Sequence, residues 1–161
     1  MRFTTFNSSD TKYDPTMLIY LDNCCFNRPY DDQSHVNIFL ETQAKLYIQE
    51  SILSGNYQLV WSYILQYKND LNPYINHKHE IQKWKHHASH LVSEAAEIIA
   101  TATVYQTIGL HPKDALHCAC AVSVKADYFV TTDKQLIKAA RQITGLRVVN
   151  PLTFIQEETK P

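Results

Sequence analysis

One stretch of the sequence decides the fold: Met17-Leu18-Ile19-Tyr20-Leu21-Asp22-Asn23. Its first five residues form an apolar run, which predicts a short strand buried in a sheet. The run ends on Asp22, and a charged side chain at the point where a buried strand leaves the sheet is a candidate for chemistry. Two later carboxylates, Asp114 and Asp133, occupy comparable positions. The three aspartates are therefore the first candidates for a functional site.

Apolar runs and amphipathic segments alternate along the rest of the chain. Further strands are predicted at residues 57–63, 127–131 and 146–149. Helices are predicted at residues 33–54, 62–72, 74–91, 94–108, 113–124 and 134–142, whereas residues 23–32 are rich in turn formers and predict a loop. Ser34 and Thr132 are the expected helix caps, and Gly55 an expected stop. Strands separated by helices predict a parallel sheet with helices on both faces.

Length and composition fit one folded domain. The 161 residues are 45% hydrophobic and 19% charged, which is ordinary for a globular protein. We expect an N-terminal extension at residues 1–16, the domain at 17–155 and a C-terminal tail at 156–161, with Met17 as a second candidate start of translation. No apolar run approaches the roughly 20 residues of a membrane helix, and no signal-like apolar core precedes the domain. We therefore expect a cytoplasmic protein without a membrane partner.

Net charge and cysteine spacing add little about partners. The formal charge of -1 at pH 7 gives no general attraction to nucleic acid, so a local basic patch or bound metal ions would have to supply it. The cysteines form two tight clusters without CxxC spacing, at residues 24–25 and 118–120. This pattern favours reduced cysteines that pack as small hydrophobic residues, with a four-cysteine metal site as the alternative.

The three aspartates are expected at one edge of the sheet. Ligands of parallel α/β sheets bind outside the carboxyl ends of the strands. Asp22 and Asp133 follow strands, and Asp114 in the first turn of a helix can face the same crevice. Carboxylates without basic partners repel one another, and Mg²⁺ or Mn²⁺ relieves that repulsion because hard cations take oxygen ligands. Such an ion polarises a phosphodiester and lowers the pKa of a bound water, which permits hydrolysis at neutral pH.

Each of these residues also has a purely structural interpretation. An aspartate in the first turn of a helix favours the helix dipole, and an aspartate after a strand can cap or turn the chain. Thr131 and Thr132 can hydrogen-bond an aspartate or a metal-bound water, although helix capping by Thr132 is the simpler interpretation. His117, one helical turn after Asp114, can orient that residue or be a core histidine.

The segments around the three aspartates resemble a known family. They read Leu21-Asp22-Asn23, then Lys113-Asp114-Ala115-Leu116-His117-Cys118-Ala119, then Tyr128-Phe129-Val130-Thr131-Thr132-Asp133. They are similar to the signature segments of PIN domains, metal-dependent ribonucleases common among bacterial toxins of toxin-antitoxin pairs. The resemblance runs from Met17 to about Ile155. Residues 27–32, Asn-Arg-Pro-Tyr-Asp-Asp, are similar to a bacterial subgroup that carries Arg-Pro-Phe-Asp-Asp there.

The resemblance implies a three-layer α/β/α sandwich with a mainly parallel sheet of four or five strands. It also implies a Mg²⁺ or Mn²⁺ site at Asp22, Asp114 and Asp133. The family carries a fourth acid, a glutamate after the second strand, where this chain has Lys68, or Gln66 if the alignment slips. A lysine facing the carboxylates would weaken metal binding by its charge or contact the substrate instead.

The resemblance implies a metal-dependent endoribonuclease that acts on RNA, and toxins of toxin-antitoxin pairs are a common type of such proteins. Small antitoxin partners and homodimers are expected on the same ground. Three interpretations of the missing acid stay open. Asp70 or Glu94 substitutes from nearby, one metal ion on three aspartates suffices, or the domain is a degenerate module that binds RNA or a protein partner without cleavage.

Two further groups are candidates for substrate contact. Arg28 can bind a phosphate through its guanidinium fork, or pair with Asp31 or Asp32 at the surface. His86 and His90 have the i, i+4 spacing of a helical zinc pair but lack the HExxH pattern, so a solvated helix face is favoured. Together with the lysines of this segment, they would form a basic patch for an RNA backbone. These lysines are Lys78, Lys83 and Lys85.

Overall fold

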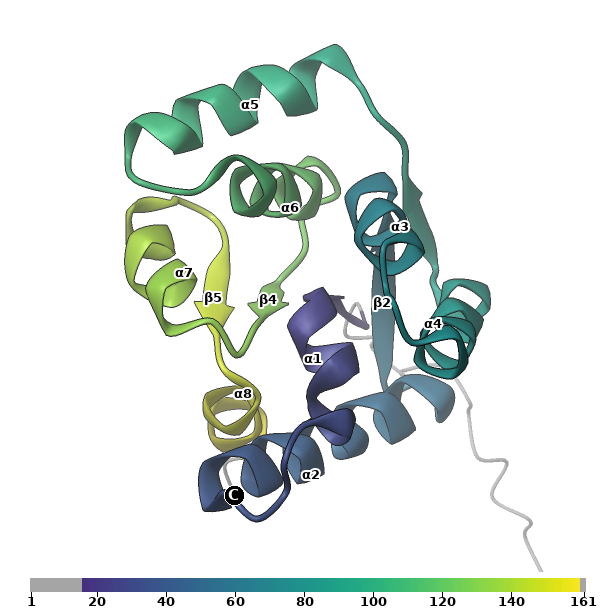
Figure 1. Cartoon of the computed structure of the whole chain (residues 1–161). Coiled ribbons are helices and arrows are strands. Elements are labelled where there is room, and N and C mark those ends of the chain that lie inside the picture. Colours follow the sequence, from purple (N-terminus) through teal and green to yellow (C-terminus); the bar gives the residue numbers. More distant parts are fainter. Residues whose placement is uncertain (1–15, 160–161) are drawn as a thin grey trace, which may run out of the picture.

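A five-stranded parallel sheet forms the centre of the protein in the computed structural model, which describes residues 16–159 (Figure 1). The strands are β1 (Met17–Leu21), β2 (Tyr57–Ser62), β3 (His90–Val92), β4 (Tyr128–Val130) and β5 (Arg147–Val149). Their order is β3-β2-β1-β4-β5, and every pairing is parallel. The apolar run that ends at Asp22 is therefore the central strand.

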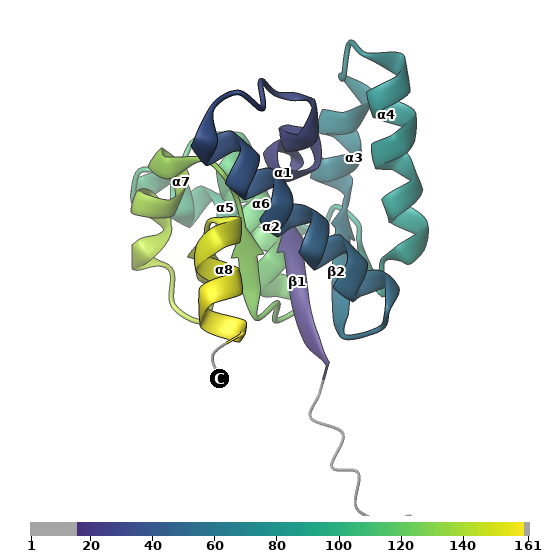
Figure 2. The ribbon, with the colours of Figure 1, turned by 90° about the horizontal axis from the view of Figure 1, so that it is seen from below.

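Helices cover both faces of this sheet. Within residues 16–159 they are α1 (Asn23–Asn27), α2 (Val36–Leu53), α3 (Tyr63–Asp70), α4 (Ile75–Gln82), α5 (Ala96–Thr107), α6 (Pro112–Ser123), α7 (Lys134–Ala139) and α8 (Pro151–Glu158). Figure 1 shows α2 and α8 on one side of the sheet and α5 and α6 on the other, and α2 lies beside α8 in Figure 2. The predicted α/β/α sandwich is confirmed, with a sheet that is wholly parallel and has five strands.

The core lies on both faces of the sheet, and part of it is packed between β1, β4 and helix α6. The ring of Tyr20 stacks on that of Phe129, with centroids 4.9 Å apart and planes 9° apart. The near-continuous apolar character of α6 is explained by its burial, because six of its twelve residues are buried. All four cysteines are free thiols, as their spacing predicted. Among residues 16–159, no helix is long and apolar enough to span a bilayer.

Two local predictions were wrong. The segment predicted as a loop, residues 23–32, forms α1 and a 3-10 helix at Arg28–Tyr30. These helical pieces are only five and three residues long, too short for a periodic pattern to show in the sequence. The helix predicted at 74–91 ends as α4 at Gln82, a 3-10 helix follows at Lys83–His87, and Leu91 lies in the edge strand β3.

Helix boundaries also differ from the predicted ones. Helix α2 begins at Val36 with His35 rather than Ser34 at its N-cap, and α7 is capped by Asp133 rather than Thr132. The Asp133 carboxylate accepts hydrogen bonds from the first free N–H groups of α7, which a threonine one residue earlier cannot reach. Helix α8 continues to Glu158, beyond the predicted domain end at residue 155. The predicted extension at residues 1–16 lies, except for its last residue, outside the described residues.

Lys45 is buried in α2 although its side chain is ionisable. It is 5% exposed, and its Nζ lies 5.8 Å from the centroid of the Phe26 ring. Among residues 16–159 it has no hydrogen bond or ion pair. Burial lowers the pKa of Lys45 to about 8, although the nearby Cys25 acts in the opposite direction. The charged form of Lys45 therefore destabilises the fold at neutral pH.

We expect Lys45→Met to increase the free energy of unfolding at pH 7, and the gain to shrink as the pH rises from about 8 to 10.5. In this range unfolded wild-type protein keeps the proton while folded protein has lost it, so wild-type stability rises with pH. The pKa difference between 10.5 and about 8 corresponds to about 3 kcal/mol. Urea unfolding across this pH range measures the effect, with the exposed Lys138→Met as control. A difference between wild type and Lys45→Met that does not change with pH would contradict it.

Candidate acidic site at the carboxyl edge of the sheet

The site lies where the strand order reverses. The chain runs from β1 to β2 and β3 on one side, then returns to β4 and β5 on the other. This reversal between β1 and β4 is the point where parallel α/β sheets bind ligands. Leu21 pairs with Val130, so the next residues, Asp22 and Thr131, leave the sheet side by side. The backbone N–H of Asp22 donates to the carbonyl of Val130 over 2.9 Å.

The Asp22 carboxylate is held from several directions. It is the N-cap of α1 and only 3% exposed. Its Oδ1 accepts from the backbone N–H of Asn23 at 2.7 Å. Its Oδ2 accepts from the Thr131 hydroxyl at 2.8 Å and from the Cys24 thiol at 3.4 Å. Asp22 is therefore a fixed carboxylate, whose position depends on both β1 and β4.

Thr131 connects Asp22 to Asp133. The Thr131 side chain is fully buried, and its Oγ1 donates to Asp22 and accepts from the backbone N–H of Asp133 at 3.1 Å. Asp133 is exposed, and its Oδ1 accepts from the N–H groups of Gln135 and Leu136 at 2.9 and 3.1 Å. The backbone N–H of Thr132 donates to Cys24 Sγ at 3.3 Å. Of the two threonines, Thr131 is therefore the one that contacts an aspartate side chain.

Asp114 is the third acid of the site. It is half-buried in the first turn of α6, and its carboxylate has no hydrogen bond among residues 16–159. Burial raises the pKa of Asp114, and the negative charges of Asp22 and Asp133 raise it further. Lys68 and His111 act in the opposite direction without reversing the shift. Asp22 and Asp133 therefore lie close enough to Asp114 for their charges to act on it.

Lys68 brings a positive charge to these acids. It projects from the last turn of α3, and its charge lowers the pKa of both Asp22 and Asp114. Burial alone would raise the pKa of Asp22. The charge that His117 carries when it is protonated, the charge of Lys68, and the hydrogen bonds from Thr131 and Cys24 lower it below its ordinary value instead. Lys68 thus acts directly on the acidic site.

His117 lies beneath the site. It is fully buried in α6, and its Nδ1 is hydrogen-bonded to the Tyr20 hydroxyl, which also bonds Ser62. Its Nε2 has no hydrogen-bond partner among the described residues and lies 4.0 Å from Asp22 Oδ1. Burial lowers the pKa of His117 to about 4, so the ring is neutral at pH 7. His117 therefore faces Asp22, as part of the core, rather than orienting Asp114.

The three acids offer the type of ligand atom, carboxylate oxygen, that a hard cation binds. Three carboxylates supply the oxygen ligands that Mg²⁺ and Mn²⁺ prefer. Burial, and then the charges of Asp22 and Asp133, raise the pKa of Asp114. Within residues 16–159, however, no three His, Cys, Asp or Glu side chains are already placed to hold a metal ion. Asp22 is fixed, whereas Asp114 and Asp133 are more exposed. Metal binding would therefore require these two side chains to turn toward Asp22, next to the charge of Lys68.

The other predicted site residues lie elsewhere. Arg28 pairs with Asp31 and Glu41, each at 3.0 Å, which leaves its fork engaged within the protein. Asp70 accepts from Gln66 at 2.9 Å. Glu94 is exposed beside Tyr63, and both burial and the charge of Glu94 raise the pKa of Tyr63. Neither Asp70 nor Glu94 is among the charges that shift the pKa of Asp22 or Asp114. Their role as substitute acids stays a prediction.

The basic segment is not one continuous helix, so His86 and His90 do not have the i, i+4 relation that their spacing suggested. His86 lies in the 3-10 helix and His90 in β3, so the two residues do not share a helix face. Lys83 pairs with Glu80 at 2.6 Å, and Lys78 donates to the carbonyl of Asp70 at 3.2 Å. The RNA-binding role of this segment stays a prediction.

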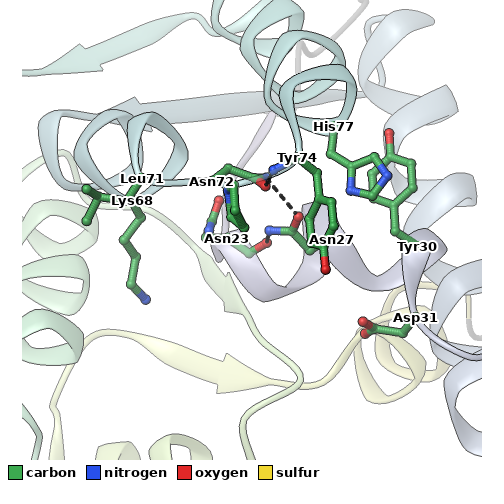
Figure 3. A pocket seen from close by; sticks show the side chains of 10 residues that line it. Asn23, Asn27, Tyr30, Asp31, Lys68, Leu71, Asn72, Tyr74 and His77 are labelled. Carbon is green, nitrogen blue, oxygen red and sulfur yellow. Dashed lines mark hydrogen bonds between the residues drawn. The ribbon is translucent and has the colours of Figure 1, made fainter.

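A cavity of about 610 Å³ lies beside the acidic site and shares Lys68 with it (Figure 3). Its other walls come from residues 23–31, before α2, and residues 71–77, which run from the C-cap of α3 into the first turn of α4. The sequence did not predict this cavity. Both segments are rich in asparagine and aromatic residues, which was the available signal. Neither has a periodicity that would show that the two segments meet.

Comparisons with known proteins identify relatives of the fold only. No protein-family model matches the sequence, and no curated protein matches it. Twelve chains of solved structures match. One belongs to the crystal structure of VapBC2 from Rickettsia felis bound to a DNA fragment from their promoter. That chain is 16% identical to this one, with a TM-score of 0.54, and the match covers 83% of this chain and 98% of that chain. At this identity the likeness establishes the fold.

Proposed function

Because the chain has a PIN-like fold, we propose that it is a metal-dependent endoribonuclease that hydrolyses RNA phosphodiester bonds at the acidic site. The observation that carries this proposal is the placement of Asp22 and Asp133 after the neighbouring strands β1 and β4, with the Asp114 carboxylate of α6 near enough to be affected by both charges. The three residues are far apart in the sequence: Asp22 follows β1 and caps α1, Asp114 lies in the first turn of α6, and Asp133 caps α7. A purely structural role for each would not require them to share one crevice at the point where the strand order reverses.

Each side chain has a distinct part in the proposed site. Asp22 is the fixed ligand, oriented by Thr131. Asp114 and Asp133 supply the second and third carboxylates. A Mg²⁺ or Mn²⁺ ion held by the three would polarise the phosphodiester and lower the pKa of the attacking water. Lys68 would balance the negative charge of the phosphate as the RNA backbone approaches the acids.

The second candidate function is binding of RNA or a protein partner without cleavage. The observation that favours it is Lys68, whose charge acts on two of the three acids. The absence of a preformed three-ligand group among residues 16–159 points the same way. In this case the domain would keep the crevice and lose the metal. The two functions differ in one measurable property, which is cleavage that depends on a divalent ion.

Partner proteins belong to the proposal as well. The similar chain comes from a structure of VapBC2 bound to a DNA fragment from their promoter. We propose that this protein also pairs with a small antitoxin protein that covers the acidic crevice, and that it forms a homodimer. Co-expression with a short reading frame adjacent to its gene, followed by size-exclusion chromatography, tests the pairing.

Removal of divalent ions is expected to stop cleavage. Purified protein should cut end-labelled single-stranded RNA in Mg²⁺ or Mn²⁺, EDTA should abolish the cuts, and adding the ion back should restore them. Three carboxylates cannot act together on an anionic phosphodiester without a cation, because all the charges repel. Cleavage that persists at the same rate in EDTA would contradict the metal assignment. RNA binding without cleavage in any ion would support the second candidate function.

A further inference from the structure

The cavity beside the acidic site combines aromatic rings with side-chain amides (Figure 3). Its volume of about 610 Å³ lies in the range of small-molecule sites, about 300–1,000 Å³. The residues that line it are Asn23, Asn27, Tyr30, Asp31, Lys68, Leu71, Asn72, Pro73, Tyr74 and His77. This lining differs in chemistry from the adjacent acids, because it offers flat rings and neutral hydrogen-bonding groups.

The aromatic side chains of the cavity are packed against one another and form a stacking surface. The rings of Tyr30 and His77 are stacked, with centroids 3.7 Å apart and planes 8° apart. The Tyr74 ring lies 5.0 Å from that of His77. Tyr30 and Tyr74 are nevertheless 44% and 64% exposed. Large rings that are ordered against one another and still open to solvent are the usual surface on which unpaired bases stack.

The amide side chains are oriented by hydrogen bonds that leave part of their capacity unused. Asn72 Nδ2 donates to Asn27 Oδ1 at 3.2 Å, and Asn27 Nδ2 donates to the Asn23 carbonyl at 3.0 Å. Each of these Nδ2 groups carries two hydrogens and uses one of them here. The Oδ1 of Asn23 is buried and has no hydrogen-bond partner among the described residues. Such groups match the donor and acceptor edges of a nucleobase.

Lys68 joins the cavity to the acids. It lines the cavity, and its charge acts on Asp22 and Asp114. We propose that the cavity binds the base of an unpaired RNA nucleotide, whose phosphate is held at Lys68 next to the acids. This inference rests on the proposed function for the identity of the substrate. Paired bases are stacked inside a duplex and cannot enter, so the cavity selects RNA that is single-stranded beside the scissile phosphate.

The test is binding of a fluorescently labelled single-stranded RNA pentamer, followed by anisotropy in EDTA so that no cleavage occurs. His77→Ala and Tyr74→Ala should each raise Kd by roughly 5- to 100-fold, the range expected when stacking on one base is lost. His77→Phe, which keeps a flat ring, should bind nearly as well as wild type. Tyr47→Ala is the matched control, because Tyr47 is another exposed tyrosine, with 47% of its surface accessible, but it does not line the cavity.

Abasic substitution identifies the base that occupies the cavity. One abasic position of the pentamer should weaken binding to wild type as much as Tyr74→Ala does, and should cause no further loss in that variant. Equal binding of wild type, His77→Ala and Tyr74→Ala would overturn the inference, as would equal affinity for a duplex. If ring-dependent binding is found but no ion supports cleavage, the proposed nuclease function fails and the base site stands. If cleavage occurs and both variants bind normally, only the base site fails.

Discussion

We expect the Asp22→Asn variant to cleave RNA at least about 100-fold more slowly than wild type at the same ion concentration, since loss of an outer-shell partner alone costs 10- to 100-fold in metal sites. Asp22 is the most buried acid of the site, and the fold holds it through the Thr131 hydroxyl, the Cys24 thiol and the N–H of Asn23. Asparagine keeps the shape and one acceptor oxygen. The variant therefore removes the negative charge with little change in packing.

Asp127→Asn is the matched control for this variant. Asp127 also accepts a hydrogen bond from a backbone N–H, that of Leu18 at 2.8 Å, but it lies at the opposite end of β1. We expect this control to cleave RNA like wild type. Initial rates over a range of Mn²⁺ concentrations measure both variants, and circular dichroism with urea unfolding confirms that each is folded. If Asp22→Asn cleaved RNA at the wild-type rate, the catalytic site would have to lie elsewhere.

The second large effect is expected at Lys68. Lys68→Glu changes the local charge by two units beside the proposed metal ligands, which at an effective dielectric near 20 corresponds to a few kcal/mol. We expect at least a roughly tenfold gain in Mn²⁺ affinity and a marked rise in metal-dependent cleavage. Titration calorimetry without RNA measures the affinity directly. The exposed Lys138→Glu in α7 is the control for a change in net charge alone.

The same variant should bind RNA less tightly when no metal is present. Lys68 lines the cavity beside the acids, so its replacement by glutamate puts a negative charge where the phosphate is proposed to lie. Opposite changes in metal affinity and metal-free RNA affinity would show that Lys68 acts on both. Unchanged Mn²⁺ affinity and cleavage would favour the non-cleaving function, because a restored carboxylate would then have no metal to bind.

The parts of the site that the sequence predicted are those with strong local signals. Met17–Leu21 reads as a buried strand because an apolar run needs a core, and Asp22 was noticed because charge at its end is unusual. Asp114 follows Pro112 at a helix start, and Asp133 follows a second apolar run. Each of these signals, an apolar run or a helix start, lies within a few consecutive residues. Prediction from them succeeded because secondary structure and burial follow from local pattern.

The features that the sequence did not reveal depend on contacts between distant residues. Thr131 bonds Asp22 across 109 positions of the chain, and Cys24 meets Thr132 across 108. The edge strand β3 is three residues long and exists only because β2 offers it a pairing edge. Arg28 was predicted as a candidate phosphate ligand, but in the structure its guanidinium pairs with Glu41, thirteen residues later. No pattern within either segment of these pairs specifies its partner.

The sequence by itself determined a parallel α/β fold and three aspartates after apolar or helical signals, because these follow from hydrophobic pattern and helix-capping chemistry. Only the tertiary structure decided which groups surround them. Parallel strand pairing brings Asp22, Asp133 and Thr131 to one edge, and packing of α3 adds the charge of Lys68. The meeting of residues 23–31 with 71–77 creates the cavity. Electrostatic coupling and cavity shape arise from distances in space, which are fixed when the helices pack on the sheet.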